Sequence, residues 1–426
     1  MSGLDLFQKR KSLLGPAYRL FYDRPLHIVR GEGVWLFDAD GRKYLDMYNN
    51  VPHVGHCHPR VVDAICSQAR TLNTHTRYLH ENVVNYAERL TGKFPDELDT
   101  AMFCCTGSEA NELALRVARA ATGGEGIIVT GNAYHGNTKA SYEISPEECP
   151  LEDLPPYVVT VPDPDVYRGR YRGDDAGMRY AEHVQEAVDT LLERGVKPAA
   201  FIVDTIISSG GIGTPPPGYL ARVAEIIRAA GGLFIADEVQ PGFGRTGDYF
   251  WGFESDGLVP DIVTLGKPMG NGHPIAAMVT SRGLVEEFSR NVGYFNTFGG
   301  NPVSCAAAIA VLDVLEEENL QENAAQQGQH IVAGLQELAK RHELIGDVRG
   351  KGLFIAIELV DDRTERTPAR EKTTRVVNDL RDRGVLVGSI GPDSNILKLR
   401  SPMVLQQAEV DLMLQTLDAS LSAVSA

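Results

Sequence analysis

The chain is predicted to be an α/β protein, because short apolar strands alternate with amphipathic helices through its middle. In the helical pattern 107–122, apolar residues recur at the spacing that places them on one face. A second such pattern begins near Tyr219. Continuous apolar strands flanked by helices indicate a sheet buried on both faces, which is typical of parallel strands. We therefore predict a large domain with a mostly parallel seven-stranded sheet, its strands being 101–105, 126–130, 157–161, 199–203, 233–237, 262–265 and 275–280.

A second, smaller α+β domain is predicted because the pattern changes after about residue 303. At 426 residues the chain is also long for a single core. The N-terminal segment should join the smaller domain through a hairpin at Asp40-Gly41. We predict three parts: 1–50, 51–302 and 303–426. The further elements expected are helices at 60–72, 82–91, 303–316, 322–341 and 371–383 and strands at 353–359 and 396–400.

Charge and composition exclude several classes of partner. A formal net charge of −16 argues against nucleic acid and anionic membranes, although a cleft can still be locally basic. No apolar run approaches the roughly 20 residues of a membrane span, and the start MSGLDLFQKRKSLLG lacks a signal peptide's apolar stretch. The six cysteines follow no metal or disulfide spacing. We therefore expect a cytoplasmic protein with reduced thiols and no metal.

Asp237 and Lys267 are the strongest candidates for catalytic residues. Each follows an apolar stretch, in LFIADEV and DIVTLGKPMG. A buried lysine can form a Schiff base with the aldehyde of pyridoxal phosphate. A buried carboxylate can hold the ring nitrogen of that cofactor protonated, so that the ring accepts electrons. Most pairs of this kind are merely solvated residues at strand ends. The neighbouring motifs therefore decide whether Asp237 and Lys267 form a cofactor site or only end their strands.

The stretch CCTGSEANELALRVAR predicts an anion site at the start of a helix. Thr106 and Glu109 have the spacing of a capping box. The backbone N–H groups of Gly107 and Ser108 would then point at an anion, with phosphate the obvious ligand. Turns of this kind also occur without ligands in α/β proteins.

Two further motifs offer groups that suit a phosphorylated heterocycle. GNAYHG places Tyr134 and His135 beyond the carboxyl end of strand 126–130, where ligands of open α/β sheets bind. Tyr134 could stack on a flat ring or pack at the edge of the core. In NTFGGNP, Thr297 offers a hydroxyl group to a phosphate or to its own turn.

Two rival motifs are less consistent with their surroundings. GFGRTG at 242–247 matches a dinucleotide pattern, but Glu238-Val239-Gln240-Pro241 separate it from the strand and no helix pattern follows. HVGHCHP gathers His53, His56, Cys57 and His58, yet its spacing matches no established zinc site, so a loop contact is favoured.

Taken together, these motifs resemble the class III (omega-) aminotransferase family of fold-type I pyridoxal phosphate enzymes. TGSEAN, YHG, ADEVQPGFGRTG, GK and TFGGNP occur in the order of that family over nearly the whole chain. The resemblance implies a homodimer with shared active sites. It implies that Lys267 forms the Schiff base and that Asp237 pairs with the ring nitrogen. The residues implied to hold the cofactor are Gly107, Ser108, Tyr134, His135, Asp237, Val239, Gln240, Lys267 and, from the neighbouring subunit, Thr297.

Within the family, the chain resembles the phospho-lyases of ethanolamine phosphate and phosphohydroxylysine. The segments that carry this resemblance are NNVPHVGHCHP, LNTHTRYLH, GKPMGNGHP and YFNTFGGNPVSC. Many aminotransferases of the class carry Glu-Pro where this chain has Asp204-Thr205. Near the C-terminus, Lys398 stands where many carry a carboxylate-binding arginine, and Arg400 follows. Two cations on one strand face would suit a dianionic phosphate, and Arg77 could be a third.

The resemblance leaves three hypotheses open. The first is a lyase that expels phosphate from a small phosphorylated amino alcohol such as ethanolamine phosphate, giving an aldehyde, ammonia and inorganic phosphate. The second is an omega-aminotransferase that uses pyruvate or 2-oxoglutarate. The third, a cofactor-binding protein without catalysis, is disfavoured because Lys267 and Asp237 are both present. The sequence does not identify the phosphorylated amine, the subunit that supplies Arg77, or the pathway.

Overall fold

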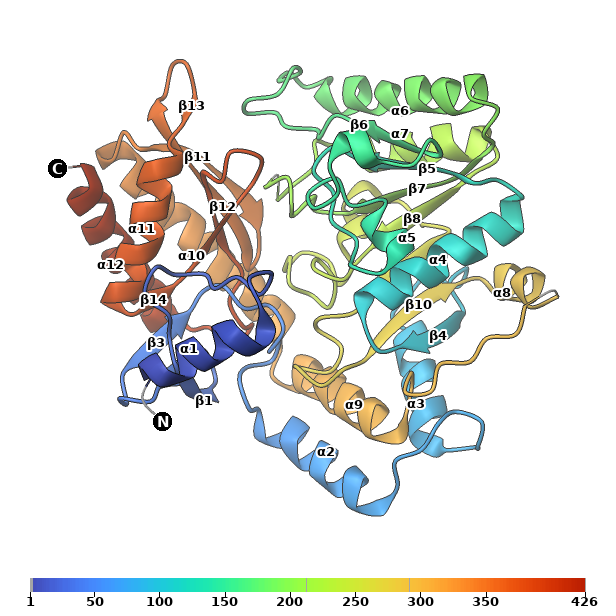
Figure 1. Ribbon diagram of the computed structural model, residues 1–426, viewed down its shortest axis with the longest axis horizontal. Coiled ribbons are helices and arrows are strands. Elements are labelled where there is room, and N and C mark those ends of the chain that lie inside the picture. Colours follow the sequence, from blue (N-terminus) through green and yellow to red (C-terminus); the bar gives the residue numbers. More distant parts are fainter. Residues whose placement is uncertain (1–2, 212, 291, 426) are drawn as a thin grey trace.

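The computed structural model describes residues 3–211, 213–290 and 292–425. Its largest element is a seven-stranded sheet in the order β4-β10-β9-β8-β7-β5-β6, in which β10 alone runs antiparallel to its neighbours. The predicted α/β class and the mostly parallel sheet are confirmed (Figure 1). The strands are β4 (Thr100–Cys104), β5 (Gly126–Thr130), β6 (Val158–Val161), β7 (Pro198–Asp204), β8 (Leu233–Asp237), β9 (Ile262–Leu265) and β10 (Ala276–Thr280).

Helices cover both faces of this sheet because its strands are apolar on both faces. Ile202 and Ile235 pack in one cluster with α4 (Gly107–Thr122), whereas the adjacent Phe201 and Phe234 pack in another with α6 (Ala176–Glu193) and α7 (Tyr219–Ala229). Successive side chains of a strand point to opposite faces, which produces this division. The strands are therefore buried, and only their ends are free to hold ligands. The remaining helices along this sheet are α2 (Pro59–Thr71), α3 (Glu81–Thr91), α5 (Lys139–Tyr142) and α8 (Arg282–Ser289).

Two smaller sheets lie beside the large one (Figure 1). The first joins the N-terminal hairpin to the C-terminal region, because β3 pairs with β14. Gly41, with φ +83°, forms its predicted turn. The strands of the first sheet are β1 (Ile28–Glu32), β2 (Trp35–Asp38), β3 (Lys43–Asp46) and β14 (Val385–Leu386). The strands of the second sheet are β11 (Ile345–Lys351), β12 (Phe354–Asp362), β16 (Ile396–Leu399) and β15 (Gly388–Ile390), and β13 (Thr367–Pro368) pairs with β12.

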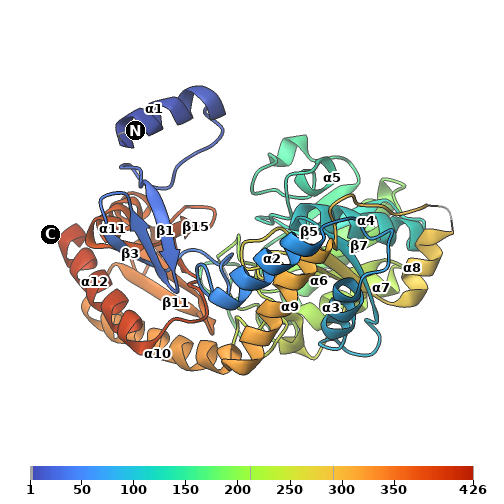
Figure 2. The ribbon, with the colours of Figure 1, turned by 90° about the horizontal axis from the view of Figure 1, so that it is seen from below.

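Helices link the smaller sheets to the rest of the molecule. α9 (Pro302–Glu317) packs against α2 and α3, with ion pairs from Arg60 to Glu317 and from Arg89 to Asp313. The first helix after the predicted boundary at 302 therefore packs against helices that precede it, and the division at 50 and 302 stays a prediction. The other helices are α1 (Gly3–Leu14), α10 (Leu320–Arg341), α11 (Arg370–Arg383) and α12 (Gln407–Ser425). Figure 2 shows α1 projecting away from the sheets.

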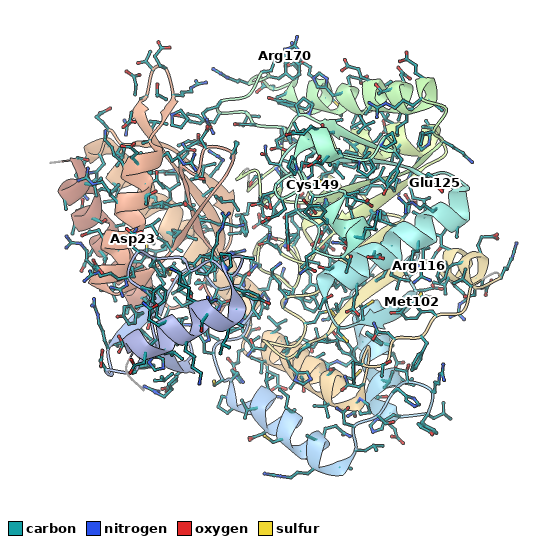
Figure 3. All side chains as sticks on the ribbon, viewed as in Figure 1. Asp23, Met102, Arg116, Glu125, Cys149 and Arg170 are labelled. Atoms are coloured by element: carbon teal, nitrogen blue, oxygen red, sulfur yellow. The ribbon has the colours of Figure 1, made fainter. Side chains whose placement is uncertain are left out.

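Side chains fill the space between sheets and helices, as Figure 3 shows, with Cys149 buried and Arg170 exposed at the outer edge near α6. All six cysteines are free. Among the described residues, no helix is both long enough and apolar enough to cross a bilayer. Helices α1, α5, α6, α8 and α12 and strands β1, β11, β13, β14 and β15 were not predicted from the sequence.

Candidate active site

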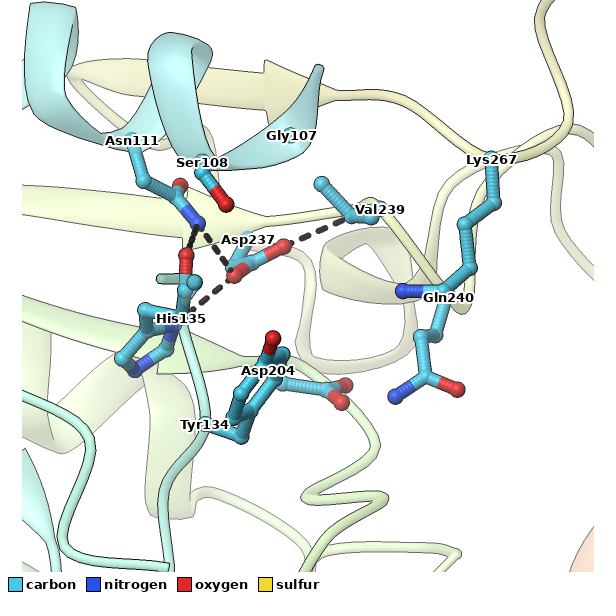
Figure 4. Close-up of a pocket in the computed structure, with 11 residues that line it drawn as sticks. Gly107, Ser108, Asn111, Tyr134, His135, Asp204, Asp237, Val239, Gln240 and Lys267 are labelled. Carbon is cyan, nitrogen blue, oxygen red and sulfur yellow. Dashed lines mark hydrogen bonds and ion pairs between the residues drawn. The ribbon is translucent and has the colours of Figure 1, made fainter. Parts of the chain in front are cut away.

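A cavity of about 120 Å³ opens at the carboxyl ends of β7 and β8 (Figure 4). This position agrees with the rule that ligands of open α/β sheets bind beyond the carboxyl ends of parallel strands. Eight of the nine predicted cofactor-binding residues line it, together with three others. The lining residues are Gly107, Ser108, Asn111, Tyr134, His135, Gly136, Asp204, Asp237, Val239, Gln240 and Lys267. Of the predicted cofactor-binding set, Thr297 is the residue that does not line the cavity.

Asp237 ends β8 and is held by three donors. Its Oδ2 atom accepts hydrogen bonds from His135 Nδ1 at 2.7 Å and Asn111 Nδ2 at 2.9 Å. Its Oδ1 atom accepts the Val239 N–H at 3.1 Å. Asn111 is itself fixed, since Nδ2 also donates to the His135 carbonyl oxygen and Oδ1 accepts the Thr264 hydroxyl. These contacts hold a carboxylate facing the cavity in one orientation.

Lys267 follows β9 and turns its amine toward the space near Asp237 (Figure 4). Burial lowers the pKa of Lys267, and the Arg400 cation lowers it further, while the carboxylates of Asp237 and Asp204 oppose both effects. A lysine with a lowered pKa is more often neutral, and a neutral amine can attack an aldehyde or accept a proton. The loop after Lys267 is fixed by Asn271, which bonds to the backbones of Val54 and Gly55.

The start of α4 forms the opposite wall of the cavity. The predicted capping box is present: Thr106 accepts the Glu109 N–H at 3.2 Å, and the Glu109 carboxylate accepts the Thr106 N–H at 2.9 Å. The N–H groups of Gly107 and Ser108 belong to the first turn, where donors lack partners within the helix. A Cβ atom on Gly136 would lie 2.4 Å from Ser108 Oγ, so only glycine lets this loop approach the helix start. The wall therefore suits an anion.

The two predicted substrate-phosphate residues near the C-terminus come from the second small sheet and do not line this cavity, but each interacts with residues that do: Arg400 bonds to Gln240, and the charge of Lys398 acts on Asp204 and Lys267. Lys398 lies on β16 and is 3% exposed, and Arg400 directly follows that strand. Burial and the Arg400 cation lower the pKa of Lys398 well below its usual value, while Asp204 and Glu147 oppose this effect. The Lys398 ammonium group lies 5.3 Å from the centroid of the Phe354 ring. The Arg400 guanidinium instead donates to Gln240 Oε1 and to the Tyr48 carbonyl oxygen.

Arg77 and Thr297 are exposed and lie outside this cavity. The Arg77 guanidinium is 3.9 Å from the centroid of the Phe295 ring, two residues before Thr297. The neighbouring Asn296 donates to the Glu109 carboxylate at 3.1 Å. The structure therefore gathers Arg77 and Thr297 in one exposed region without bringing either into the cavity of its own chain.

Asn111 and Asp204 were not predicted to line the site. Asn111 falls on the apolar face of α4, where its type gave no signal, and only its contact with Asp237 reveals a role. Asp204 is paired in register with Asp237 at the ends of adjacent parallel strands. That register could have been inferred from the sequence, because both residues end apolar stretches.

The rival motifs have structural roles in the described residues. His53 contacts the Phe243 carbonyl oxygen at 2.8 Å and Arg245 at 3.0 Å. His56 pairs with Asp46 and His58 with Glu318, so the three histidines face different partners. The GFGRTG segment is a series of turns followed by a short 3-10 helix from Gly252, which is no dinucleotide-binding turn.

The donor set fits pyridoxal phosphate. The start of α4 can hold its phosphate, the Asp237 carboxylate can pair with its ring nitrogen, and the Lys267 amine can bond to its aldehyde. His135 Nε2 is buried without a hydrogen-bond partner, although its ring is fixed through Nδ1. It therefore has a polar atom to offer a bound group.

Comparison with known proteins settles the family. The family model for class III aminotransferases matches residues 21–421. The chain belongs to the class III aminotransferase family. It is therefore a pyridoxal phosphate enzyme of fold type I.

Similar proteins differ in their named activities. "Alanine--glyoxylate aminotransferase 2-like" of Drosophila melanogaster is 45% identical over 100% of this chain and 88% of its own length. "Ethanolamine-phosphate phospho-lyase homolog 1" of Caenorhabditis elegans is 39% identical over 98% and 93%. A solved phospholyase from Arthrobacter in complex with phosphoethanolamine has a TM-score of 0.95 and 45% identity, covering 98% of this chain and 100% of its own. The predicted resemblance to the phospho-lyase branch is confirmed, whereas lyase and transferase activities stay open.

Proposed function

We propose that this enzyme eliminates phosphate from a small phosphorylated amino alcohol such as ethanolamine phosphate. The observation that carries the proposal is the buried Lys398 on β16, whose charge acts on Asp204 and Lys267 of the cavity wall and which has Arg400 beside it. A phosphate dianion would oppose both causes that lower the pKa of Lys398, since it brings negative charge next to the buried amine. The likeness to the Arthrobacter phospholyase, whose structure contains phosphoethanolamine, supports the same substrate class.

The residues of the chain have separate tasks in this reaction. The cofactor supplies an electron sink for the bond that breaks. Lys267 is the general base that takes a proton from the carbon bearing the amine, because its lowered pKa favours the neutral form. Asp237, fixed by His135 and Asn111, keeps a negative charge where the ring nitrogen binds. Lys398 stabilises the charge that develops on the departing phosphate.

The overall reaction is balanced without an added oxidant or reductant. The carbon next to the amine loses a proton, the C–O bond to phosphate breaks, and its electron pair leaves with inorganic phosphate. Water then converts the unsaturated amine that remains to an aldehyde and ammonia. For ethanolamine phosphate, the sum is one substrate and one water giving acetaldehyde, ammonia and phosphate.

The deciding experiment uses the cofactor-loaded enzyme with ethanolamine phosphate and no keto acid. Inorganic phosphate and ammonia are measured together over time. Equal and catalytic release of both supports elimination. Turnover of an amine only when pyruvate or 2-oxoglutarate is added would instead establish an aminotransferase.

The aminotransferase alternative is kept because of one comparison. The Drosophila relative at 45% identity carries an aminotransferase name. Both reactions need the same contacts to the cofactor, so Asp237, Lys267 and the start of α4 do not separate them. The groups that face the substrate do, and Lys398 is the first of these to test.

We also propose a homodimer in which Arg77 and Thr297 complete the active site of the partner subunit. The support is that both residues are exposed in the single chain, and that Phe295 and Phe298 beside them are 44% and 70% exposed. Exposed aromatic side chains of this kind are typical of interface residues. In this arrangement Thr297 would hold the cofactor phosphate and Arg77 the substrate phosphate.

Mixed dimers can test this assignment directly. An Arg77→Ala chain mixed with a Lys267→Ala chain contains one site in which the intact Lys267 of one chain meets the intact Arg77 of the other. If Arg77 acts across the interface, mixing the two weak or inactive variants restores activity on ethanolamine phosphate, up to about one site in four. If Arg77 acts within its own chain, mixing restores nothing. The same mixture assayed without subunit exchange is the control.

The cytoplasm is the compartment that we propose. The support is that all six cysteines are free, which is typical of proteins in reducing compartments. We propose no nucleic-acid or membrane partner, given the net charge of −16.

A further inference from the structure

Gln240 has an amide group whose orientation is set by its neighbours. Its Oε1 atom accepts hydrogen bonds from Arg400 Nη1 and, at 3.3 Å, from Asn50 Nδ2. Its Nε2 atom donates to Ser208 Oγ. Because guanidinium and amide N–H groups only donate, turning the amide over would place donors against donors. Figure 4 shows the nitrogen of Gln240 turned toward Asp204 and the oxygen turned away.

The hydrogen bonds continue in one direction from Arg400 to Asp204. Ser208 Oγ accepts from Gln240 and donates to Asp204 Oδ2. Asp204 also accepts the backbone N–H groups of Ile206 and Ser208, both at 3.1 Å. The chain therefore has a cation at one end, a carboxylate at the other, and every donor pointing the same way. Hydrogen bonds in such a series strengthen one another.

Arg400 is placed for this task by the region around Tyr48. Its Nε atom donates to the Tyr48 carbonyl oxygen at 2.8 Å, and its guanidinium lies 4.4 Å from the centroid of the Tyr48 ring. The Phe21 ring is in turn 4.7 Å from that of Tyr48. With its Nε and Nη1 donors engaged and 8% of the residue exposed, Arg400 is anchored rather than free in the cavity.

One donor of Gln240 remains for a ligand. An amide nitrogen carries two hydrogens, and Ser208 accepts one of them. Gln240 lines the cavity together with Lys267, so the second N–H can reach an acceptor there. In pyridoxal phosphate, the acceptor next to the aldehyde is the phenolic oxygen.

We propose that Arg400 is a positioning residue for the cofactor rather than a ligand of the substrate phosphate. By holding the carbonyl oxygen of Gln240, it makes Gln240 present an N–H group to the phenolic oxygen of the cofactor. A donor there withdraws electron density from that oxygen and weakens its hold on the proton of the Lys267 linkage. This inference rests on the cofactor of the family and holds whether the enzyme is a lyase or an aminotransferase.

The test is a pH titration of the visible absorbance of the cofactor-loaded protein, which needs no turnover. Arg400→Met should raise the apparent pKa of the bound cofactor by about one pH unit, since only the 3.3 Å contact from Asn50 Nδ2 then holds the Gln240 oxygen in place and the amide can turn that oxygen inward. Gln240→Leu should raise it by a similar amount. In the double variant, the loss of Arg400 should add nothing to the loss of Gln240.

Other outcomes would overturn the proposal. Additive shifts in the double variant would mean that the charge of Arg400 acts directly and not through Gln240. An unchanged apparent pKa in Arg400→Met, with a raised KM for ethanolamine phosphate, would mean that Arg400 binds the substrate phosphate. If the enzyme does not eliminate phosphate, the phosphate assay will show it, and the absorbance shifts of the variants will be unaffected. The proposed function and the proposed role of Arg400 can therefore be disproved independently.

Two further variants separate the proposed effect from a general disturbance of the fold. Gln240→Glu can still accept from Arg400 but has no N–H to donate, so it too should raise the apparent pKa, and no change would contradict the proposal. Arg381→Met is the matched control, because Arg381 is also 8% exposed and pairs with Asp382 on α11. It should leave the absorbance titration unchanged.

Discussion

The two sides of the active site are built in different ways. The cofactor side comes from neighbouring strand ends and one helix start, so Asp204, Asp237 and Lys267 lie close together once the parallel sheet forms. The proposed substrate side combines Lys398 from a separate sheet with the exposed Arg77. Local motifs therefore position the proposed cofactor contacts, whereas the proposed substrate contacts depend on how distant parts of the molecule pack together.

The largest effect is expected on the cofactor side, from Lys267→Ala. This change removes both the bond to the cofactor and the general base, so turnover should fall by about 10⁴-fold or more. Release of phosphate and ammonia measures it. Activity close to that of the parent protein would contradict the role proposed for Lys267 and the cofactor side built around it.

Asp237→Asn should lower turnover by about 10²- to 10³-fold with little effect on the fold. The amide keeps the shape of the carboxylate but not its charge, so His135 Nδ1 no longer bonds to a carboxylate. The rate with saturating substrate and the melting temperature are measured together. Asn111→Asp, which changes a neighbour of the same carboxylate, should also lower the rate; an unchanged rate in both would remove the carboxylate from the mechanism.

Lys398→Met tests the substrate side. It should lower kcat/KM for ethanolamine phosphate by about 10- to 100-fold, the value of a hydrogen bond to a charged group, and leave the cofactor bound. Lys372→Met, at an exposed ion pair with Asp361, is the control and should change nothing. An equal loss of turnover with an unphosphorylated amine would mean that Lys398 serves the cofactor side instead.

The smallest effect is expected on the free energy of unfolding, from Glu238, which directly follows Asp237. Glu238 is buried, and burial raises its pKa to about 8, although Gly252, Thr205 and Phe253 donate hydrogen bonds to it. A raised pKa in the folded state means that this group contributes stability at low pH and loses it as pH rises toward about 8. Between the unfolded value and about 8, the free energy of unfolding should fall by at most about 1.4 kcal/mol per pH unit from this group.

Glu238→Gln removes this titration. The melting temperature of the variant should depend less on pH between 5 and about 8 than that of the parent protein, whatever its absolute level. An equal slope in both proteins would show that Glu238 is ionised in the fold throughout that range.

The sequence by itself determined much of the cofactor side. Strands β5, β8 and β9 and helix α4 begin and end where their apolar patterns predicted, and the capping box of Thr106 and Glu109 formed as its spacing indicated. These features depend on neighbours within a few residues. The apolar stretches also ended at Asp237 and just before Lys267, so the pair proposed as catalytic could be singled out before the fold was known.

Only the tertiary structure decided the partners of these groups. Arg400 bonds to Gln240, 160 residues earlier, and Asn111 bonds to Asp237, 126 residues later. Neither contact has a periodic pattern, because each depends on how two separately formed elements pack. The sequence showed Arg400 as one of two cations suited to phosphate, and the fold instead directed its guanidinium to an amide oxygen. A side chain's type determines what it can bind, but packing over long separations determines what it meets.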